Sequence, residues 1–250
     1  MNKDYRQKQL LNLLGEKQVL STAEIVNSLG ISPATARRDI TELDTLGLLK
    51  KVRNGVEAVK QGIMTSGIKD HRINNIDEKQ KIANVATEIC RDGESIFLTC
   101  GSTMLMLAKA LCGRKVQIIT NYLPLANYVI EHDHDDVVIM GGQYNKNQAI
   151  TLALDTNTDA MYSANIMFTS GKGITKNGLY KTDMLIANSE QRMLSRVEKL
   201  IVLLDSSKLG KQAGMLFTSL EHIDLLITDK AADPKIIEEL RAKGLKIILA

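Results

Sequence analysis

The spacing of apolar residues divides the chain into two regions. Over the first sixty residues they recur at helical spacing, and each helical stretch is followed by a glycine. Beyond Gly93, short apolar runs alternate with helical stretches, which is typical of a mostly parallel sheet covered on both faces. Residues 60–75 keep neither period and are expected to form a linker. The pattern predicts a small helical domain over 1–59 and a larger α/β domain over 76–250.

Cap signals place three short helices in the first domain. Ser21 and Glu24 have the spacing of a capping box, in which Ser21 caps the helix and Glu24 reaches back to it. Ser32 is expected to cap the next helix, with Pro33 at the first helical position, where a missing N–H costs nothing. The helices are expected at 4–14, 22–29 and 33–46, ending at Gly15, Gly30 and Gly47. Helix, tight glycine turn and helix is the spacing of a helix-turn-helix.

The third of these helices has a polar face suited to DNA. Its apolar stripe, which must face the core, consists of Ala36, Ile40 and Leu43. Arg38 points almost directly away from that stripe, and Thr35 and Arg37 flank it. Arginine binds guanine edges bidentately or holds phosphates, and the sequence leaves both modes open.

A basic hairpin follows this helix. Asn54-Gly55 is a strong two-residue turn signal, so residues 48–58 are expected to form a β-wing. The alternative is a solvated charged helix and hairpin on an ordinary α/β protein. A helix-turn-helix, a basic outward face and a wing in this order favour DNA binding. The residues expected to contact DNA are Ser32, Thr35, Arg37, Arg38, Lys50, Lys51 and Arg53.

Charge supports this prediction once it is divided along the chain. Residues 1–60 hold ten Lys and Arg against seven Asp and Glu, whereas the other 190 residues hold 22 of each kind. The whole excess of +3 therefore lies in the first sixty residues and suggests a polyanionic partner for this part of the chain.

Composition excludes several other classes of protein. No apolar run approaches the roughly 18 residues of a membrane span, and the polar residues 1–9 have no signal-peptide core. Hydrophobic residues at 44% and charged residues at 24% argue against disorder. Cys90, Cys100 and Cys112 lack the spacing of a zinc site and are expected to be reduced thiols. We expect a cytoplasmic protein with no cofactor, no metal and no membrane partner.

Strands and helices alternate through the second domain. Strands are expected at 95–99, 116–120, 137–140, 165–169, 199–204, 223–228 and 245–249. Helices are expected from an Asp77 cap to Gly93 and at 104–111, 124–131, 183–196 and 234–243. In parallel sheets of this kind, ligands bind beyond the carboxyl ends of the strands.

The loops that follow five of these strands contain small, hydroxyl or charged residues. Residues 100–103 lead straight into a helix, whose free N–H groups suit a phosphate. Each loop taken alone is better explained by a cap or a tight turn with no ligand. Five at one edge favour a site for a small phosphorylated polyol. The residues expected to bind it are Gly101, Ser102, Thr103, Asn121, Gly141, Gly142, Lys172, Lys181, Asp205 and Lys208.

Some of these residues also allow other roles. Asp183 and Asp205 could serve as an isomerase base, although such carboxylates more often accept hydrogen bonds from ligand hydroxyls. Lys181 and Lys208 could form Schiff bases, but no neighbour in the sequence signals a lowered pKa, so phosphate binding is preferred. The acidic and His-containing run 131–136 is expected to be a solvated loop and not a metal site.

One motif resembles a known family. Ile31-Ser32-x-x-Thr35-x-Arg37-Arg38-Asp39-Ile40, followed by Leu43, Gly47 and Leu49, resembles the winged helix of the DeoR family of bacterial transcriptional regulators. The wing departs from the family, which usually has a His-Gly-Gly-Ala-like sequence where this chain has Arg53-Asn54-Gly55-Val56.

The second domain resembles the sensor domain of the same family, which shares its fold with ribose-5-phosphate isomerase. Gly101-Ser102-Thr103 matches the family's phosphate loop, with Cys100 in place of a common Asp, and Asp205-Ser206-Ser207-Lys208 matches its D-S-S-K segment. Segments 121–128, 140–146 and 178–185 are similar to one branch, the repressors of L-ascorbate utilisation operons. That resemblance implies L-ascorbate 6-phosphate as the effector.

These observations predict a DNA-binding repressor of a sugar-acid catabolic operon that is not an enzyme. A single recognition helix reads few base pairs, so a homo-oligomer, a dimer or a tetramer, is expected on repeated half-sites. The alternatives are an activator or repressor that responds to another phosphosugar, and a sugar-phosphate isomerase with an added DNA-binding head.

Overall fold

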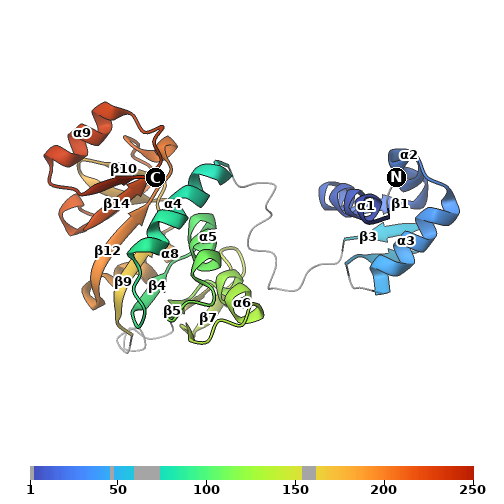
Figure 1. Ribbon diagram of the computed structural model, residues 1–250, viewed down its shortest axis with the longest axis horizontal. Helices are drawn as coiled ribbons and strands as arrows, with labels where there is room; N and C mark the ends of the chain where they lie inside the picture. Colours follow the sequence, from blue (N-terminus) through green and yellow to red (C-terminus); the bar gives the residue numbers. More distant parts are fainter. Residues whose placement is uncertain (1–2, 46–47, 59–73, 154–161) are drawn as a thin grey trace. The chain divides into compact units, whose positions relative to one another are not determined.

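The computed structural model describes residues 3–45, 48–58, 74–153 and 162–250. The chain forms two compact units, Met1–Gly62 and Ile63–Ala250 (Figure 1). Most of the expected linker, together with Leu46 and Gly47 at the end of the third helix, lies outside the described residues.

The first unit contains the expected helices in the expected order. Ser21 accepts a hydrogen bond from the Glu24 backbone, and the Glu24 carboxylate accepts one from the Ser21 backbone, which confirms the capping box. Gly30 ends that helix in the left-handed conformation at φ 61°. The first helix was predicted to end at Gly15 but continues to Lys17. The helices are α1 (Lys3–Lys17), α2 (Thr22–Leu29) and α3 (Pro33–Thr45).

The wing is present, with its turn one residue earlier than predicted. Strands β2 (Lys50–Val52) and β3 (Gly55–Glu57) pair through Val52 and Gly55, so the turn residues are Arg53 and Asn54. Asn54 takes the positive φ of 64°. Gly55 meets a different requirement, because strand β1 (Val19–Ser21) pairs with β3 and a Cβ at Gly55 would lie 2.3 Å from the Leu20 carbonyl oxygen.

A parallel sheet forms the centre of the second unit, as expected. Among the described residues it has seven strands, in the order β15-β14-β12-β9-β4-β5-β6, and all neighbours are parallel. Each strand lies within one residue or two of its predicted range. The strands are β4 (Ser95–Leu98), β5 (Gln117–Thr120), β6 (Val137–Ile139), β9 (Ala164–Thr169), β12 (Val197–Leu203), β14 (Leu225–Thr228) and β15 (Ile247–Leu249).

Alternate side chains of these strands enter two separate cores, one on each face of the sheet. Ile96 and Leu98 pack into one core and Phe97 between them into the other. The first core is covered by α4 (Ile76–Ile89), α5 (Ser102–Leu111) and α6 (Leu123–Glu131). The second core contains residues of α8 (Met184–Gln191) and α9 (Pro234–Ala242).

Two helix predictions need correction. The N-cap position of helix α4 is Asn75 and not Asp77. Asn75 has a positive φ of 57° and makes no side-chain cap hydrogen bond, and the helix ends at Ile89, before Gly93. The helix expected over 183–196 consists of α8, capped by the Asp183 side chain, and a separate 3-10 turn at Leu194–Arg196.

Two small antiparallel elements were not predicted. One is a hairpin of β7 (Gln143–Asn145) and β8 (Ile150–Leu152). The other is a sheet of β10 (Gly173–Thr175), β11 (Gly178–Lys181) and β13 (Met215–Thr218), which lies against the second core. Their strands have three or four residues each, too few for a period to stand out.

The expectations for the loop 131–136 and the cysteines have mixed outcomes. His134 is buried. Its Nδ1 accepts a hydrogen bond from the Gly113 N–H at 3.1 Å, and its Nε2 lies 2.9 Å from the Val116 carbonyl oxygen, so this His is structural. The other five residues of the loop are exposed, as expected. Cys90, Cys100 and Cys112 are free thiols. Over the part of the chain described, no helix has both the length and the apolar character to cross a membrane.

Candidate functional site

The outward face of α3 carries two exposed arginines. Ala36, Ile40 and Leu43 are buried in the core of the first unit, as predicted. Arg37 and Arg38 are exposed, while Asp39 is buried and pairs with Arg6 of α1, with 2.5 Å from Nε to Oδ2 and 2.9 Å from Nη2 to Oδ1. This bidentate pair ties α3 to α1 and fixes the direction in which Arg37 and Arg38 project.

Ser32 and Thr35 are at the N-terminus of α3, where their hydroxyls serve the cap. The Ser32 hydroxyl accepts a hydrogen bond from the Thr35 N–H at 3.1 Å, and the two hydroxyl oxygens lie 2.9 Å apart. Ser32 is therefore the N-cap that the sequence predicted. Both hydroxyls lie at the N-terminal end of α3, where backbone N–H groups and the helix dipole favour an anion.

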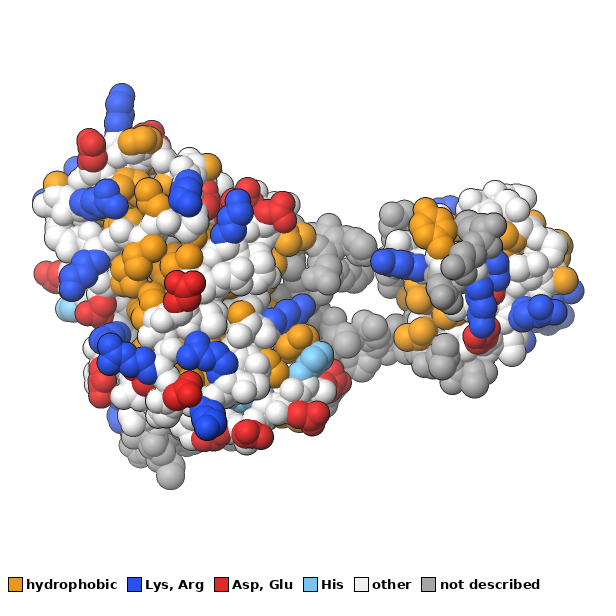
Figure 2. All heavy atoms as spheres, viewed as in Figure 1, with side chains coloured by type: hydrophobic (Ala, Val, Ile, Leu, Met, Phe, Trp, Pro, Cys, Tyr) orange, Lys and Arg blue, Asp and Glu red, His pale blue; other side chains and the backbone are white. Residues whose placement is uncertain are grey.

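The basic residues of the wing differ in whether their side chains already have a partner within the protein. Lys50 pairs with Glu57 at 2.7 Å, which also raises the Lys50 pKa, and Lys51 donates to the Thr41 hydroxyl at 3.2 Å. Arg53 is exposed in the turn. Within the described residues, no ion pair involves Arg37, Arg38 or Arg53. Figure 2 shows several Lys and Arg side chains on the visible face of this unit.

A cavity of about 250 Å³ lies at the carboxyl edge of the parallel sheet. It is formed by the loops that follow β4 and β9, by Lys208 after β12, and by residues of β11 and α8. Strands β12, β9 and β4 are neighbours in the sheet, so the loops after them meet. The lining consists of Cys100, Gly101, Ser102, Thr103, Gln148, Ser170, Gly171, Lys172, Lys181, Thr182, Asp183, Ile186, Glu190 and Lys208.

One wall of the cavity is the N-terminus of α5. Gly101 precedes the helix at φ 130°, a conformation that suits glycine, and no side chain caps the first turn. The first N–H groups of α5 therefore remain available, and the helix dipole favours an anion at this point.

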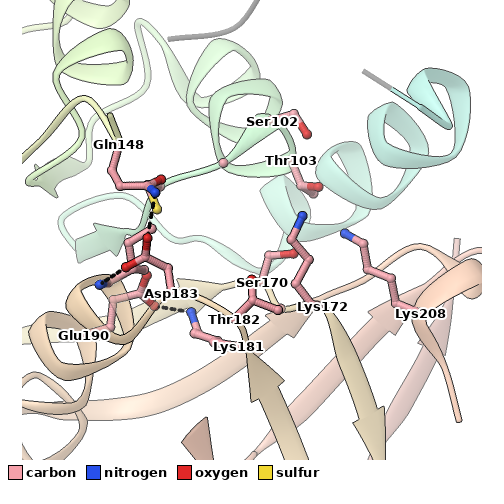
Figure 3. A pocket seen from close by; sticks show the side chains of 14 residues that line it. Ser102, Thr103, Gln148, Ser170, Lys172, Lys181, Thr182, Asp183, Glu190 and Lys208 are labelled. Carbon is pink, nitrogen blue, oxygen red and sulfur yellow. Dashed lines mark hydrogen bonds and ion pairs between the residues drawn. The ribbon is translucent and has the colours of Figure 1, made fainter. Parts of the chain in front are cut away.

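Lysines gather beside this helix end. Figure 3 shows Lys172 and Lys208 next to each other below Thr103. Burial lowers the pKa of Lys208. The Asp205 carboxylate acts against this shift, and the Lys172 ammonium group adds to it. Lys79 of α4 is 7% exposed, and burial together with Lys208 and Lys172 lowers its pKa as well. Mutual repulsion among these three ammonium groups makes the cluster a favourable place for an anion. Neither the lowered Lys208 pKa nor the position of Lys79 beside it was predicted from the sequence.

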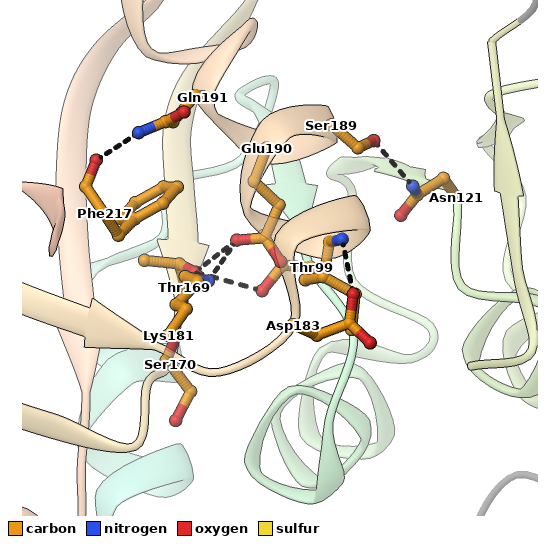
Figure 4. Close-up of polar contacts among 11 residues, drawn as sticks. Thr99, Asn121, Thr169, Ser170, Lys181, Asp183, Ser189, Glu190, Gln191 and Phe217 are labelled. Carbon is orange, nitrogen blue, oxygen red and sulfur yellow. Dashed lines mark hydrogen bonds and ion pairs between the residues drawn. The ribbon is translucent and has the colours of Figure 1, made fainter. Parts of the chain in front are cut away.

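The opposite end of the cavity contains carboxylates in hydrogen-bonded pairs. Lys181 forms a buried ion pair with Glu190 and donates to the Thr169 hydroxyl at 2.7 Å (Figure 4). Asp183 accepts a hydrogen bond from the Gln148 amide at 2.6 Å and caps α8 (Figure 3). Sequence reasoning missed Glu190 and Gln148, which reach the cavity from the end of α8 and from the β7–β8 hairpin.

Several predicted effector residues lie outside this lining. Asn121 is buried, with its amide donating to the Thr151 carbonyl at 3.1 Å and to the Ser189 hydroxyl at 3.3 Å. Gly141 and Gly142 follow β6. A Cβ at Gly142 would lie 2.0 Å from the Leu152 carbonyl oxygen, so glycine is required here because the backbone of the β7–β8 hairpin passes so close. These loops follow β5 and β6, the two strands at the far side of β4, which is why they do not converge on the cavity.

Asp205 stands behind the cavity and does not line it. Asp205 is 1% exposed, and its Oδ2 lies 3.3 Å from Nζ of Lys208, a residue that does line the cavity. Although burial acts against ionisation, bonds from Ser207, Lys208 and Asn75 lower the Asp205 pKa overall. Asp205 is thus a fixed anion that orients Lys208. Cys100 in the wall stays a neutral thiol, since burial, together with Glu190, raises its pKa to about 12.

Comparison with known proteins identifies both units. A model of the DeoR-like helix-turn-helix domain matches residues 6–62, and a model of the DeoR C terminal sensor domain matches residues 74–230. This chain belongs to the DeoR family. As a DeoR-family protein it is a DNA-binding transcriptional regulator and not an enzyme.

Curated DeoR-family relatives match over nearly the full length. The chain is 52% identical over 249 residues to the HTH-type transcriptional regulator UlaR of Escherichia coli (strain K12 / DH10B), covering 99% of both chains. The UlaR of Shigella boydii serotype 18 matches to the same extent.

Solved structures similar to this DeoR-family chain are more distant. Ribose 5-phosphate isomerase A of Methanocaldococcus jannaschii aligns with a TM-score of 0.42 at 19% identity, over 54% of this chain and 55% of that one. RipA of Yersinia pestis aligns with a TM-score of 0.46 at 12% identity, over 69% of this chain and 52% of that one. The chain thus spans about half the length of these structures.

Proposed function

We propose that this DeoR-family regulator is a repressor that leaves its operator when a phosphorylated sugar acid, L-ascorbate 6-phosphate, binds the cavity of the sensor unit. The observation that carries the proposal is the cavity wall at which the uncapped N-terminus of α5 meets Lys172 and Lys208. Backbone N–H groups, a helix dipole and ammonium groups at one point are the usual means of holding a phosphate.

The remainder of the cavity suits the rest of such a ligand. Beyond the lysines lie Gln148, Thr182, Asp183 and Glu190, which offer donors and acceptors for hydroxyl groups. A ligand with a phosphate at one end and several hydroxyls at the other matches this division. The choice of L-ascorbate 6-phosphate among such ligands follows the name of the 52% identical relatives.

On the DNA side, Arg37 and Arg38 of α3 are the proposed readers of the operator, with Arg53 of the wing as a further contact. Their exposed charges have no ion pair within the described residues, so DNA phosphates or guanine edges would be their partners. One recognition helix reads few base pairs, so we propose that a homo-oligomer binds repeated half-sites. Effector binding would alter the spacing of these helices.

The test measures operator binding by fluorescence anisotropy in the presence of a panel of ligands. The panel contains L-ascorbate 6-phosphate, ribose 5-phosphate, L-ascorbate and inorganic phosphate. We expect L-ascorbate 6-phosphate alone to weaken operator binding, by about 5–150-fold if the coupling has its usual size of 1–3 kcal/mol.

Each other outcome has a separate meaning. Release by ribose 5-phosphate alone would keep the sugar-phosphate sensor and reject the ascorbate assignment. No release by any phosphate would reject the proposal for the cavity. Lys208→Ala is expected to bind operator normally and to resist release, and Lys230→Ala, an exposed lysine outside the cavity, serves as the matched control.

A further inference from the structure

Glu190 is the most deeply buried carboxylate in the lining of the cavity, with 2% of its surface exposed. Its two oxygens differ in their surroundings. Oε2 pairs with the Lys181 ammonium and accepts a hydrogen bond from the Thr169 hydroxyl at 2.7 Å (Figure 4). Oε1 is buried as well, yet no described residue donates a hydrogen bond to it.

A buried carboxylate oxygen without a donor is unfavourable. Leaving such an oxygen unsatisfied costs about 1–3 kcal/mol, and more where the group is charged. The fold has satisfied Oε2 twice with groups from β9 and β11, and it supports the carboxylate from a helix, so the position of Glu190 is well fixed. The free oxygen is therefore a built feature of the cavity and indicates a partner that is not part of the chain.

The chemistry of the partner follows from the neighbours of Glu190. An anionic group is excluded beside an ionised carboxylate that is already paired, and Lys172 and Lys208 offer an anion a better place at the other end of the cavity. Cys100, the neutral thiol in the same wall, supplies no competing charge. What Oε1 can accept is the proton of a neutral donor, and in a polyol phosphate that donor is a hydroxyl.

We propose that Glu190 is the specificity residue of this site, with Oε1 accepting a hydrogen bond from an effector hydroxyl at the end remote from the phosphate. This inference rests on the proposed function of the cavity. Lys181 acts as the positioning residue, because its ion pair orients Oε2 and leaves Oε1 to the ligand. The lysine cluster then recognises any phosphate, and Glu190 separates polyol phosphates from those that lack the hydroxyl.

The experiment compares two ligands on two proteins by calorimetric titration. The ligands are L-ascorbate 6-phosphate and inorganic phosphate, and the proteins are the full chain and its Glu190→Gln variant. Gln keeps the size of the side chain but removes the charge that a hydroxyl donor prefers. We expect the variant to bind L-ascorbate 6-phosphate at least tenfold more weakly and inorganic phosphate as well as before. Glu239→Gln, at an exposed carboxylate of α9, is the matched control and should change neither affinity.

The ratio of the two affinities decides the inference, since a merely structural role would lower both together. Equal loss for both ligands, or no loss for either, overturns the role of Glu190 while leaving the sensor function in place. If the unaltered chain binds neither ligand, the proposed function itself fails. Should Glu190→Gln not fold, Glu190→Asp keeps the charge and shortens the reach. It is expected to show the same selective loss, and binding of both ligands as in the unaltered chain would overturn the inference.

Discussion

The Asn75 amide donates a hydrogen bond to the Asp205 carboxylate, with 2.9 Å between Nδ2 and Oδ1. Asn75 is the N-cap residue of α4, the first described helix of the second unit. Asp205 in turn lies 3.3 Å from Lys208 in the cavity lining. A short polar chain therefore connects the N-terminus of α4 with the group proposed to bind the effector phosphate.

We predict that Asn75→Gly weakens the coupling between effector and operator. Glycine accepts the positive φ of this position, so the variant removes the amide with little backbone strain. Effector binding, measured by calorimetry, should persist, while the effector-induced loss of operator affinity becomes smaller. Asn84→Gly is not suitable as a control because it lies inside α4, so Asn84→Ala is used. Full release of the Asn75→Gly variant would show that this hydrogen bond does not transmit the signal.

A second prediction concerns the pH dependence of effector binding. Burial lowers the pKa of Lys208 and of Lys79, so both lose their charge at a lower pH than an ordinary lysine. A phosphate stabilises the charged forms, so the effector-induced rise in the midpoint of thermal unfolding should shrink as pH rises from about 7.5, where the phosphate is already a dianion, toward 10.

For the protein without effector, the contribution of these lysines to folding stability changes with pH in the opposite direction. Since the pKa of each lysine is lower in the folded than in the unfolded state, the unfolded chain binds more protons in this window, and the stability contribution rises with pH. Lys208→Arg, whose guanidinium stays charged, should flatten the dependence of the effector shift on pH. An unchanged slope in that variant would remove Lys208 from the explanation.

The wing offers a matched pair of substitutions. A Cβ at Gly55 would lie 2.3 Å from the Leu20 carbonyl oxygen, whereas Asn54 already holds the positive φ of 64°. Gly55→Ala should therefore destabilise the first unit by about 1–3 kcal/mol, and Asn54→Gly should be nearly neutral. Hydrogen exchange of β1 and β3 in the full chain measures this difference. Equal protection in both variants would contradict the close approach of β1.

How much of the fold could be predicted from the sequence depends on the length of the apolar run in each element. Strand β4 and its neighbours were predicted nearly to the residue because each is an apolar run buried on both faces. The β10–β11–β13 sheet has strands of three or four residues, and its position is set by contacts with the second core and not by any local period. The turn of the wing moved by one residue because β1, which lies far away in the sequence, requires Gly55 for itself.

The candidate site was predictable in the same unequal way. Gly101 follows β4 and Lys208 follows β12, the two strands that flank β9 at the centre of the sheet, so the rule about carboxyl ends placed both at the cavity. Asn121 and Gly141 follow equally good strands, and only the order of strands in the sheet shows that these loops lie too far to the side. Glu190 gave no signal, because a single acid at the end of a helix is ordinarily exposed.

The last prediction separates two kinds of basic residue in the first unit. Arg38 is exposed on α3 with its charge free of ion pairs among the described residues, whereas Lys50 is already paired with Glu57 at 2.7 Å. Arg38→Ala should abolish specific operator binding, and Lys50→Ala should weaken it less, because Lys50 must first give up its carboxylate partner.

Operator affinity measured at several salt concentrations distinguishes the modes that the sequence left open. If Arg38 reads a base edge, its loss removes preference for the operator over unrelated DNA; if it holds a phosphate, binding weakens on all sequences and the salt slope falls by about one. Arg241→Ala in α9 of the sensor unit is the control and should bind operator normally. Undiminished operator binding by Arg38→Ala would reject α3 as the recognition helix. Arg38 is the arginine of α3 that lies directly opposite the buried stripe of Ala36, Ile40 and Leu43.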